Sequence, residues 1–167
     1  MTDAGLTSSP ASLIRSAAEG NADALERVIR DLAPSVYAYL AGMLGDDRDA
    51  DEGMQETFVR VARAVGRYDG KSDAEAWVFG IARRVAADLR PTPASPPEYP
   101  PAAGEEDEWA RRCLRALSLE LREVLVCEEI LRWDTPRISA ALGMPAEDVD
   151  HRKLAARSQL AEHMREP

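Results

Sequence analysis

The sequence predicts an all-α protein made of two small helical domains joined by a proline-rich acidic linker. Apolar residues recur at spacings of three and four along most of the 167 residues, and no stretch alternates like a strand. Only 5% of the residues are aromatic, so the core must consist mainly of Ala, Leu, Val and Ile, which favours helices. Residues 91–108 contain prolines, acidic residues and almost no core-forming side chains, which is typical of a linker.

The first domain is expected over residues 12–90, after a disordered polar tail over residues 1–11. A first helix starts at Ser12 and ends at Gly20. The amphipathic stretch 22–44 predicts a second helix, in which Pro34 favours a kink or a break.

Two further helices complete the predicted first domain. Asp49 is expected to cap the third helix, with Glu52 completing a capping box, and Gly66 marks its end. The fourth helix is expected over residues 74–89, before Pro91 stops it.

The second domain, residues 109–167, is expected to end in a helix-turn-helix. Two helical stretches, 109–117 and 119–131, precede a short helix that starts near Thr135, and a longer helix follows Gly143. A helix of about seven residues, a glycine turn and a second helix form the spacing of that motif. Its expected internal contacts are Ile138, Ala141, Leu142, Val149 and Leu154.

Composition argues against several classes of protein. A net charge of −9 is unfavourable for a protein that coats nucleic acid non-specifically. No apolar run approaches the roughly 18 residues of a transmembrane helix, and the N-terminus lacks the pattern of a signal peptide, so we expect a cytoplasmic protein without membrane contact of its own.

Neither a metal site nor a cofactor nor an enzymatic activity is expected. Cys113 and Cys127 lack CxxC spacing and are interpreted as reduced, partly buried thiols, and His151 and His163 show no metal-ligand spacing. Glu52 and Glu56 lie one turn apart, as in metal-binding bundles, but no Glu-x-x-His motif accompanies them.

The stretch Asp49–Arg90 carries the strongest functional signal. Its first helix presents acidic and amide side chains, which suit a basic partner, whereas Trp77, Arg83 and Arg84 in its second helix suit nucleic acid. The segments DADEGMQETFVRVAR and AWVFGIARRVAADLR, together with the helix-turn-helix segment LSLELREVLVCEEILRWDTPRISAALGMPAEDVDHRKLAARSQL, resemble an RNA polymerase sigma factor of the extracytoplasmic-function group.

The resemblance implies that the chain binds core RNA polymerase and directs promoter recognition, with an anti-sigma protein as a further partner. The segment that docks on the polymerase contains Asp49, Asp51, Gln55, Glu56 and Arg60. The segment that melts the −10 element contains Arg67, Tyr68, Asp69, Gly70, Lys71, Ser72, Arg83 and Arg84. The helix that reads the −35 element contains His151, Arg152, Lys153 and Arg157.

Simpler interpretations stand beside these assignments. The acidic helix face is also what a solvated helix with a Glu56–Arg60 pair would show, and the loop from Arg67 to Asp73 could be a plain surface turn. Trp77 is interpreted as a core residue, and Asp88 as the i+4 partner of Arg84.

The expected recognition helix is neutral, because its acidic residues balance its basic ones over 145–160. This predicts weak or unusual −35 binding and motivates an alternative function, a sigma-like decoy or adaptor that binds an anti-sigma factor or polymerase without reading promoters. A stand-alone helix-turn-helix repressor is a third possibility, which the QETF segment and the acidic linker disfavour.

Overall fold

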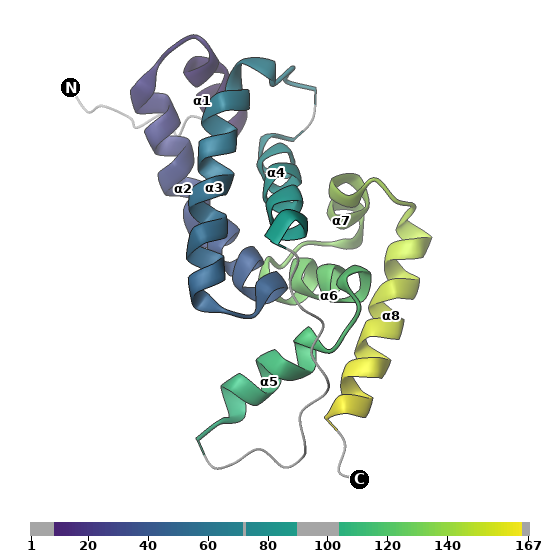
Figure 1. Cartoon of the computed structure of the whole chain (residues 1–167). Coiled ribbons are helices and arrows are strands. Elements are labelled where there is room, and N and C mark those ends of the chain that lie inside the picture. The colour runs from purple at the N-terminus through teal and green to yellow at the C-terminus, as the bar shows by residue number, and fades with distance from the viewer. Residues whose placement is uncertain (1–8, 72, 90–103, 165–167) are drawn as a thin grey trace, which may run out of the picture.

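The computed structural model describes residues 9–71, 73–89 and 104–164, and all regular elements in these ranges are helices (Figure 1). The predicted all-α class is therefore confirmed. The first half contains α1 (Pro10–Ala18), α2 (Ala22–Leu44), α3 (Asp47–Ala64), a 3₁₀ turn η1 (Val65–Arg67) and α4 (Ala74–Leu89). The second half contains α5 (Glu106–Arg115), α6 (Leu119–Leu125), a π-helical turn η2 (Val126–Ile130), α7 (Thr135–Leu142) and α8 (Ala146–His163).

Several helix boundaries differ from those expected. Asp46, not Asp49, caps α3, because its side chain accepts hydrogen bonds from the Arg48 and Asp49 amides. The Ser9 side chain caps α1, which therefore begins at Pro10 rather than Ser12. α5 begins at Glu106, three residues before the expected start, and its acidic first turn suits the positive end of the helix dipole.

Proline did not break α2, which runs without interruption past Pro34. Residues 1–8 of the expected disordered tail and most of the expected linker lie outside the described residues, whereas Pro10 and Ala11, also expected in the tail, belong to α1. In the described ranges, no helix is long and apolar enough to cross a membrane. No group of three or more His, Cys, Asp or Glu side chains in those ranges could hold a metal ion.

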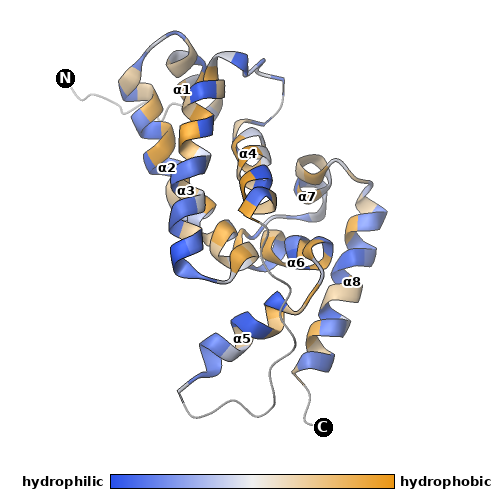
Figure 2. Cartoon of the chain, viewed as in Figure 1, coloured by the Kyte–Doolittle hydropathy of each residue, from blue (hydrophilic) through white to orange (hydrophobic). Residues whose placement is uncertain are grey.

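The core of the molecule is continuous across its two halves. Figure 2 shows α2 with apolar residues toward its C-terminal end, where it packs against η2. The two helices approach closely at Gly42, where an added Cβ would lie 2.8 Å from Val126 Cγ2 and 2.9 Å from Ile130 Cδ1. We call this contact of α2 and α4 with α6, η2 and α7 the seam.

Aromatic residues fill the seam. Phe79 of α4 makes edge-to-face contacts with Tyr39 of α2 and with Trp133, at ring-centroid distances of 5.6 and 4.8 Å. Both geometries are favourable for aromatic pairs. The guanidinium of Arg137 lies over the ring of Trp133, 4.6 Å from its centre. Arg137 also pairs with Glu75 of α4.

A buried guanidinium connects the C-terminal ends of α2 and α5 at the seam. Arg122 of α6 is 1% exposed and donates hydrogen bonds only to backbone carbonyls in the described structure. One acceptor, the Met43 carbonyl at 2.5 Å, belongs to the last turn of α2, and the others lie at the end of α5 and just beyond it. Because the last carbonyls of a helix have no partner within it, Arg122 supplies a donor to helix-end carbonyls such as those of Met43 and Arg115. Burial lowers the pKa of the Arg122 guanidinium to about 10, so it remains charged at neutral pH.

Both cysteines are free and buried, as expected, and Cys127 predicts how stability depends on pH. Burial raises the pKa of the Cys127 thiol from 9.0 to about 12. The folded chain therefore holds this proton where the unfolded chain releases it, and stability falls as pH rises from about 9 toward 12. We expect the urea midpoint to decrease between pH 8 and pH 10, and the Cys127→Ala variant to show a shallower decrease. Equal slopes in the two proteins would contradict this assignment.

Candidate functional site

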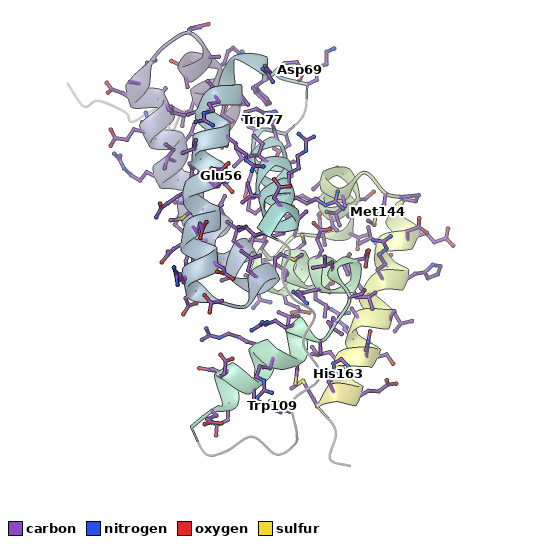
Figure 3. The ribbon with its side chains drawn as sticks, in the orientation of Figure 1. Glu56, Asp69, Trp77, Trp109, Met144 and His163 are labelled. Carbon is purple, nitrogen blue, oxygen red and sulfur yellow. The ribbon has the colours of Figure 1, made fainter. Side chains whose placement is uncertain are left out.

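The acidic and amide residues of α3 lie on the outside of the helix. Asp49, Asp51 and Gln55 are exposed, and Glu56 is partly exposed. At 3.6 residues per turn, Asp51 and Gln55 form one flank of the outer surface, and Asp49 and Glu56 form the other. Figure 3 shows Glu56 on α3, in the half of the molecule away from α8. A partner would thus meet two rows of acceptors rather than one stripe.

Arg60 links the flank of α3 that contains Glu56 to α4. Its guanidinium contacts Glu56 Oε1 at 2.7 Å and Asp88 Oδ2 at 2.6 Å, and these bonds raise its pKa. The predicted Asp88–Arg84 pair is therefore wrong, because Asp88 reaches across to α3 instead. Arg60 is held in place as a bridge between the helices, whereas Asp51 and Gln55 are exposed on the outer surface.

The loop between η1 and α4 is shaped by its own polar groups. The Asp69 carboxylate accepts a hydrogen bond from the Lys71 amide at 3.0 Å, and Gly70 adopts a left-handed φ of +73°. Tyr68 packs against Trp77 with ring centres 5.3 Å apart. Figure 3 shows Asp69 at the end of the first half and Trp77 just below it. Ser72, which was predicted to contact DNA, lies outside the described residues.

Trp77 is partly buried and packs against the core, in agreement with its interpretation as a core residue. Together with Tyr68 it forms an aromatic pair at the base of the loop. Arg67 and Lys71 are both exposed there, so the loop combines aromatic faces with cations. Aromatic faces together with cations are suited to binding unstacked bases of single-stranded nucleic acid.

Arg83 and Arg84 point in different directions, as expected for neighbours on a helix. Arg84 is exposed. Arg83 donates to Glu123 Oε1 of α6 at 2.8 Å, and the same carboxylate oxygen accepts a hydrogen bond from the buried Tyr39 hydroxyl at 2.8 Å. Burial and the Glu123 charge raise the pKa of Tyr39 well above its usual value. One of the two arginines expected to face DNA is thus held at the seam.

The helix-turn-helix forms as predicted, with α7, a left-handed Gly143 and α8. Ile138 and Val149 are buried at its centre, whereas the expected internal contact Leu154 is 70% exposed. Leu154 was assigned to the core from its spacing, but it lies on the outer face of α8, which also carries Glu147, His151 and Ser158.

Two cationic side chains of α8, Lys153 and Arg157, form ion pairs with carboxylates of the same chain. Lys153 is buried and contacts Glu128 Oε1 at 3.0 Å, and Arg157 contacts Glu128 Oε2 at 2.7 Å and Glu129 Oε1 at 3.0 Å. These bonds raise the pKa of Arg157. Of the predicted −35 residues, His151 is exposed and Arg152 is partly exposed, so the four do not form one basic surface.

Sequence reasoning missed the acidic partners of these cations. Glu123, Glu128 and Glu129 belong to one short segment of α6 and η2, and each holds a base that the sequence suggested for DNA. No local pattern indicates such pairs, because their partners lie 25 to 40 positions away. Phe79, which is buried at the seam, was likewise not singled out from the sequence.

Comparison with known proteins places this geometry in a family. The Sigma-70 region 2 family matches residues 28–90, which run from α2 to the end of α4. The ECF RNA polymerase sigma factor SigC of Mycobacterium tuberculosis is 33% identical over 162 residues, covering 89% of this chain and 87% of SigC. This chain belongs to the extracytoplasmic-function sigma factors. The predicted family and its role in transcription initiation are thereby confirmed.

Other relatives agree with membership of the sigma factor family. The RNA polymerase sigma factor CarQ of Myxococcus xanthus is 28% identical, with 75% of this sigma factor and 80% of CarQ covered. Among solved structures, CnrH in complex with the cytosolic domain of CnrY matches with a TM-score of 0.73 and 28% identity. That match covers 92% of this sigma factor and 95% of CnrH. The Bartonella quintana sigma factor RpoE, solved with the anti-sigma factor NepR, has the same fold at a TM-score of 0.65 and 18% identity, over 83% of this chain and 94% of RpoE.

Proposed function

We propose that this sigma factor binds core RNA polymerase through the outer surface of α3 and directs it to promoters. The observation that carries the proposal is the exposed acidic and amide surface of Asp51 and Gln55, within the segment that matches Sigma-70 region 2. An acidic protein gains little from non-specific contact with DNA, so a polymerase-bound role accounts for its charge.

The remaining assignments follow the two halves of the chain. We assign −10 melting to residues 12–90, with the loop from Arg67 to Lys71 and Arg84 as the contacts open to DNA. Ser72 belongs to the same assignment and lies outside the described residues. We assign −35 reading to residues 109–167, with His151 and Arg152 as the accessible contacts on α8. The role needs no covalent chemistry, and a partner of RNA polymerase would work in the cytoplasm.

A protein partner of the anti-sigma kind forms part of the proposal. CnrH, whose fold and length this chain matches closely, was solved with the cytosolic domain of CnrY. A regulator that covers either half would prevent contact with polymerase or with DNA.

Transcription with purified components tests the proposal. We expect this chain and core polymerase to yield defined start sites on genomic DNA fragments, and polymerase alone to yield none of them. The double variant Asp51→Arg with Gln55→Arg places two cations against a basic partner, and binding to core polymerase should weaken at least tenfold, about 1.4 kcal/mol.

A matched variant controls for the change of charge. Glu19→Arg with Asp31→Asn changes the charge by +3, as Asp51→Arg with Gln55→Arg does, at exposed positions outside α3, and should retain polymerase binding. Equal binding by both double variants would exclude the α3 surface.

The decoy alternative retains one specific observation in its favour. Lys153 and Arg157 of α8 are bound to carboxylates of the same chain, which leaves little positive charge for DNA. A decoy would bind polymerase or an anti-sigma factor and yield no promoter-dependent transcript in the same assay.

A further inference from the structure

The turn η2 brings two consecutive carboxylates to one side of α8. Within a π-helical turn the chain takes an extra residue, and such turns often lie at functional sites. Here the turn follows α6 directly, and the Leu131 amide after it donates to the Val126 carbonyl at 3.1 Å. Glu128 and Glu129 both reach the same guanidinium nitrogen, Arg157 Nη2.

Glu128 binds two cations of α8 with its two oxygens. Oε1 contacts Lys153 and Oε2 contacts Arg157, so the carboxylate bridges positions one turn apart on the helix. Two cations at this spacing around one oxyanion resemble the arrangement in which Lys and Arg hold a phosphate. The glutamate side chain is 21% exposed, and that of Arg157 is 55% exposed. Arg157 therefore lies where an external anion could replace the carboxylates.

Neighbouring groups fix Lys153 more firmly than Arg157. The Lys153 ammonium also donates to Thr135 Oγ1 at 2.8 Å, and Thr135 in turn donates to Asp150. Lys153 is buried, so its role is to position α8 on α7. The Arg157 side chain is 55% exposed and contacts the carboxylates of Glu128 and Glu129, so it is the cation of this group that can exchange partners.

We propose that Glu128 and Glu129 set the affinity of the second half for duplex DNA, by competing with DNA phosphates for Arg157. The proposal rests on the assignment of α8 to DNA contact. Docking of α8 on a duplex would require Arg157 to leave the two carboxylates. Breaking these ion pairs weakens binding to DNA, and its cost depends on the charges at positions 128 and 129.

The test measures binding of the full chain to a fluorescent duplex of random sequence by anisotropy, over a series of salt concentrations. The variant Glu128→Gln with Glu129→Gln keeps the shape of both side chains and removes both charges. We expect its affinity to rise roughly three- to tenfold, and the slope of log K against log salt to steepen by about 1, as for one additional phosphate contact. The gain should disappear when Arg157→Ala is added.

Matched charge and folding controls make the result decisive. Glu19→Gln with Asp31→Asn removes two exposed charges from the first half and should change neither affinity nor slope. An equal gain in this control, or a gain that persists with Arg157→Ala, would overturn the proposal. Circular dichroism checks folding, and the single variant Glu129→Gln alters only an exposed residue if the Glu128 change disturbs the turn.

The readout requires neither polymerase nor a promoter, so the two proposals can fail separately. Promoter-dependent transcription without the gain in duplex affinity would leave the sigma factor assignment intact and reject the role of Glu128 and Glu129. The gain without any transcript would support the inference and favour the decoy.

Discussion

Replacing Arg122 with methionine should destabilise the protein by about 3 kcal/mol or more, the largest effect that we expect from a single substitution. Methionine fills similar space and avoids the cost of burying a charge, but it removes the side-chain donor to the carbonyls of Met43, Arg115 and Leu117, whereas the Leu114 carbonyl keeps its hydrogen bond from the Leu117 amide. A buried polar group without a hydrogen bond costs about 1–3 kcal/mol. Urea unfolding followed by circular dichroism measures the loss.

Two variants separate this explanation from a general effect of charge. Arg122→Lys keeps the charge but has no planar fork to reach several carbonyls, so we expect an intermediate loss. Arg112→Met removes an exposed arginine of α5 and should change stability by no more than about 0.5 kcal/mol. If Arg122→Met and Arg112→Met are equally stable, the carbonyl contacts contribute nothing.

Replacing Glu123 with leucine should be the second most damaging change, at about 2–3 kcal/mol. Glu123 is 5% exposed, and its loss leaves the buried Tyr39 hydroxyl without an acceptor. The Arg83 side chain is 45% exposed, so solvent screens its ion pair and the Tyr39 contact accounts for most of the loss. Unfolding of Glu123→Leu, Tyr39→Phe and the double variant forms a cycle that should show a coupling free energy of about 1 kcal/mol or more.

Glu123→Gln and the neighbouring Glu120→Gln provide the controls. Glutamine retains an acceptor for Tyr39 and should recover most of the stability, whereas Glu120 is exposed and its replacement should have little effect. Additive losses in the Tyr39 cycle would show that the carboxylate and hydroxyl do not act together.

The sequence was sufficient to predict those helices whose ends depend on neighbouring residues, such as apolar spacing and capping side chains. The spacing of apolar residues predicted α2 and α4 with their observed ends, and Gly143 and Asp134 marked the limits of α7. The start of α3 was misplaced because three aspartates, at 46, 47 and 49, are all competent caps and only the path of the chain selects Asp46.

In the candidate site too, features set by local sequence could be predicted, and features set by packing between distant helices could not. The exposed residues of the α3 surface could be predicted, because they follow from helix periodicity and from the resemblance to a family. The pairing of Arg83 with Glu123, and of Arg157 with Glu128, could not, because it depends on how distant helices pack. Leu154 was misassigned for a related reason: its spacing from Val149 fits a helix interior, but the packed face of α8 is narrow and consists of Val149, Lys153 and Ala156.

The close approach at Gly42 joins parts of the chain that are far apart in sequence, since Tyr39 and Glu123 are separated by 84 positions. The entropy lost on closing so long a loop grows only slowly with its length, by roughly 0.6 kcal/mol for each doubling. Insertions in the connecting stretch would therefore have little thermodynamic effect, and the seam would survive large changes in its length. Selection can change the length of that connecting stretch, whereas the close approach of the two halves depends on Gly42, where a larger side chain would meet Val126 and Ile130.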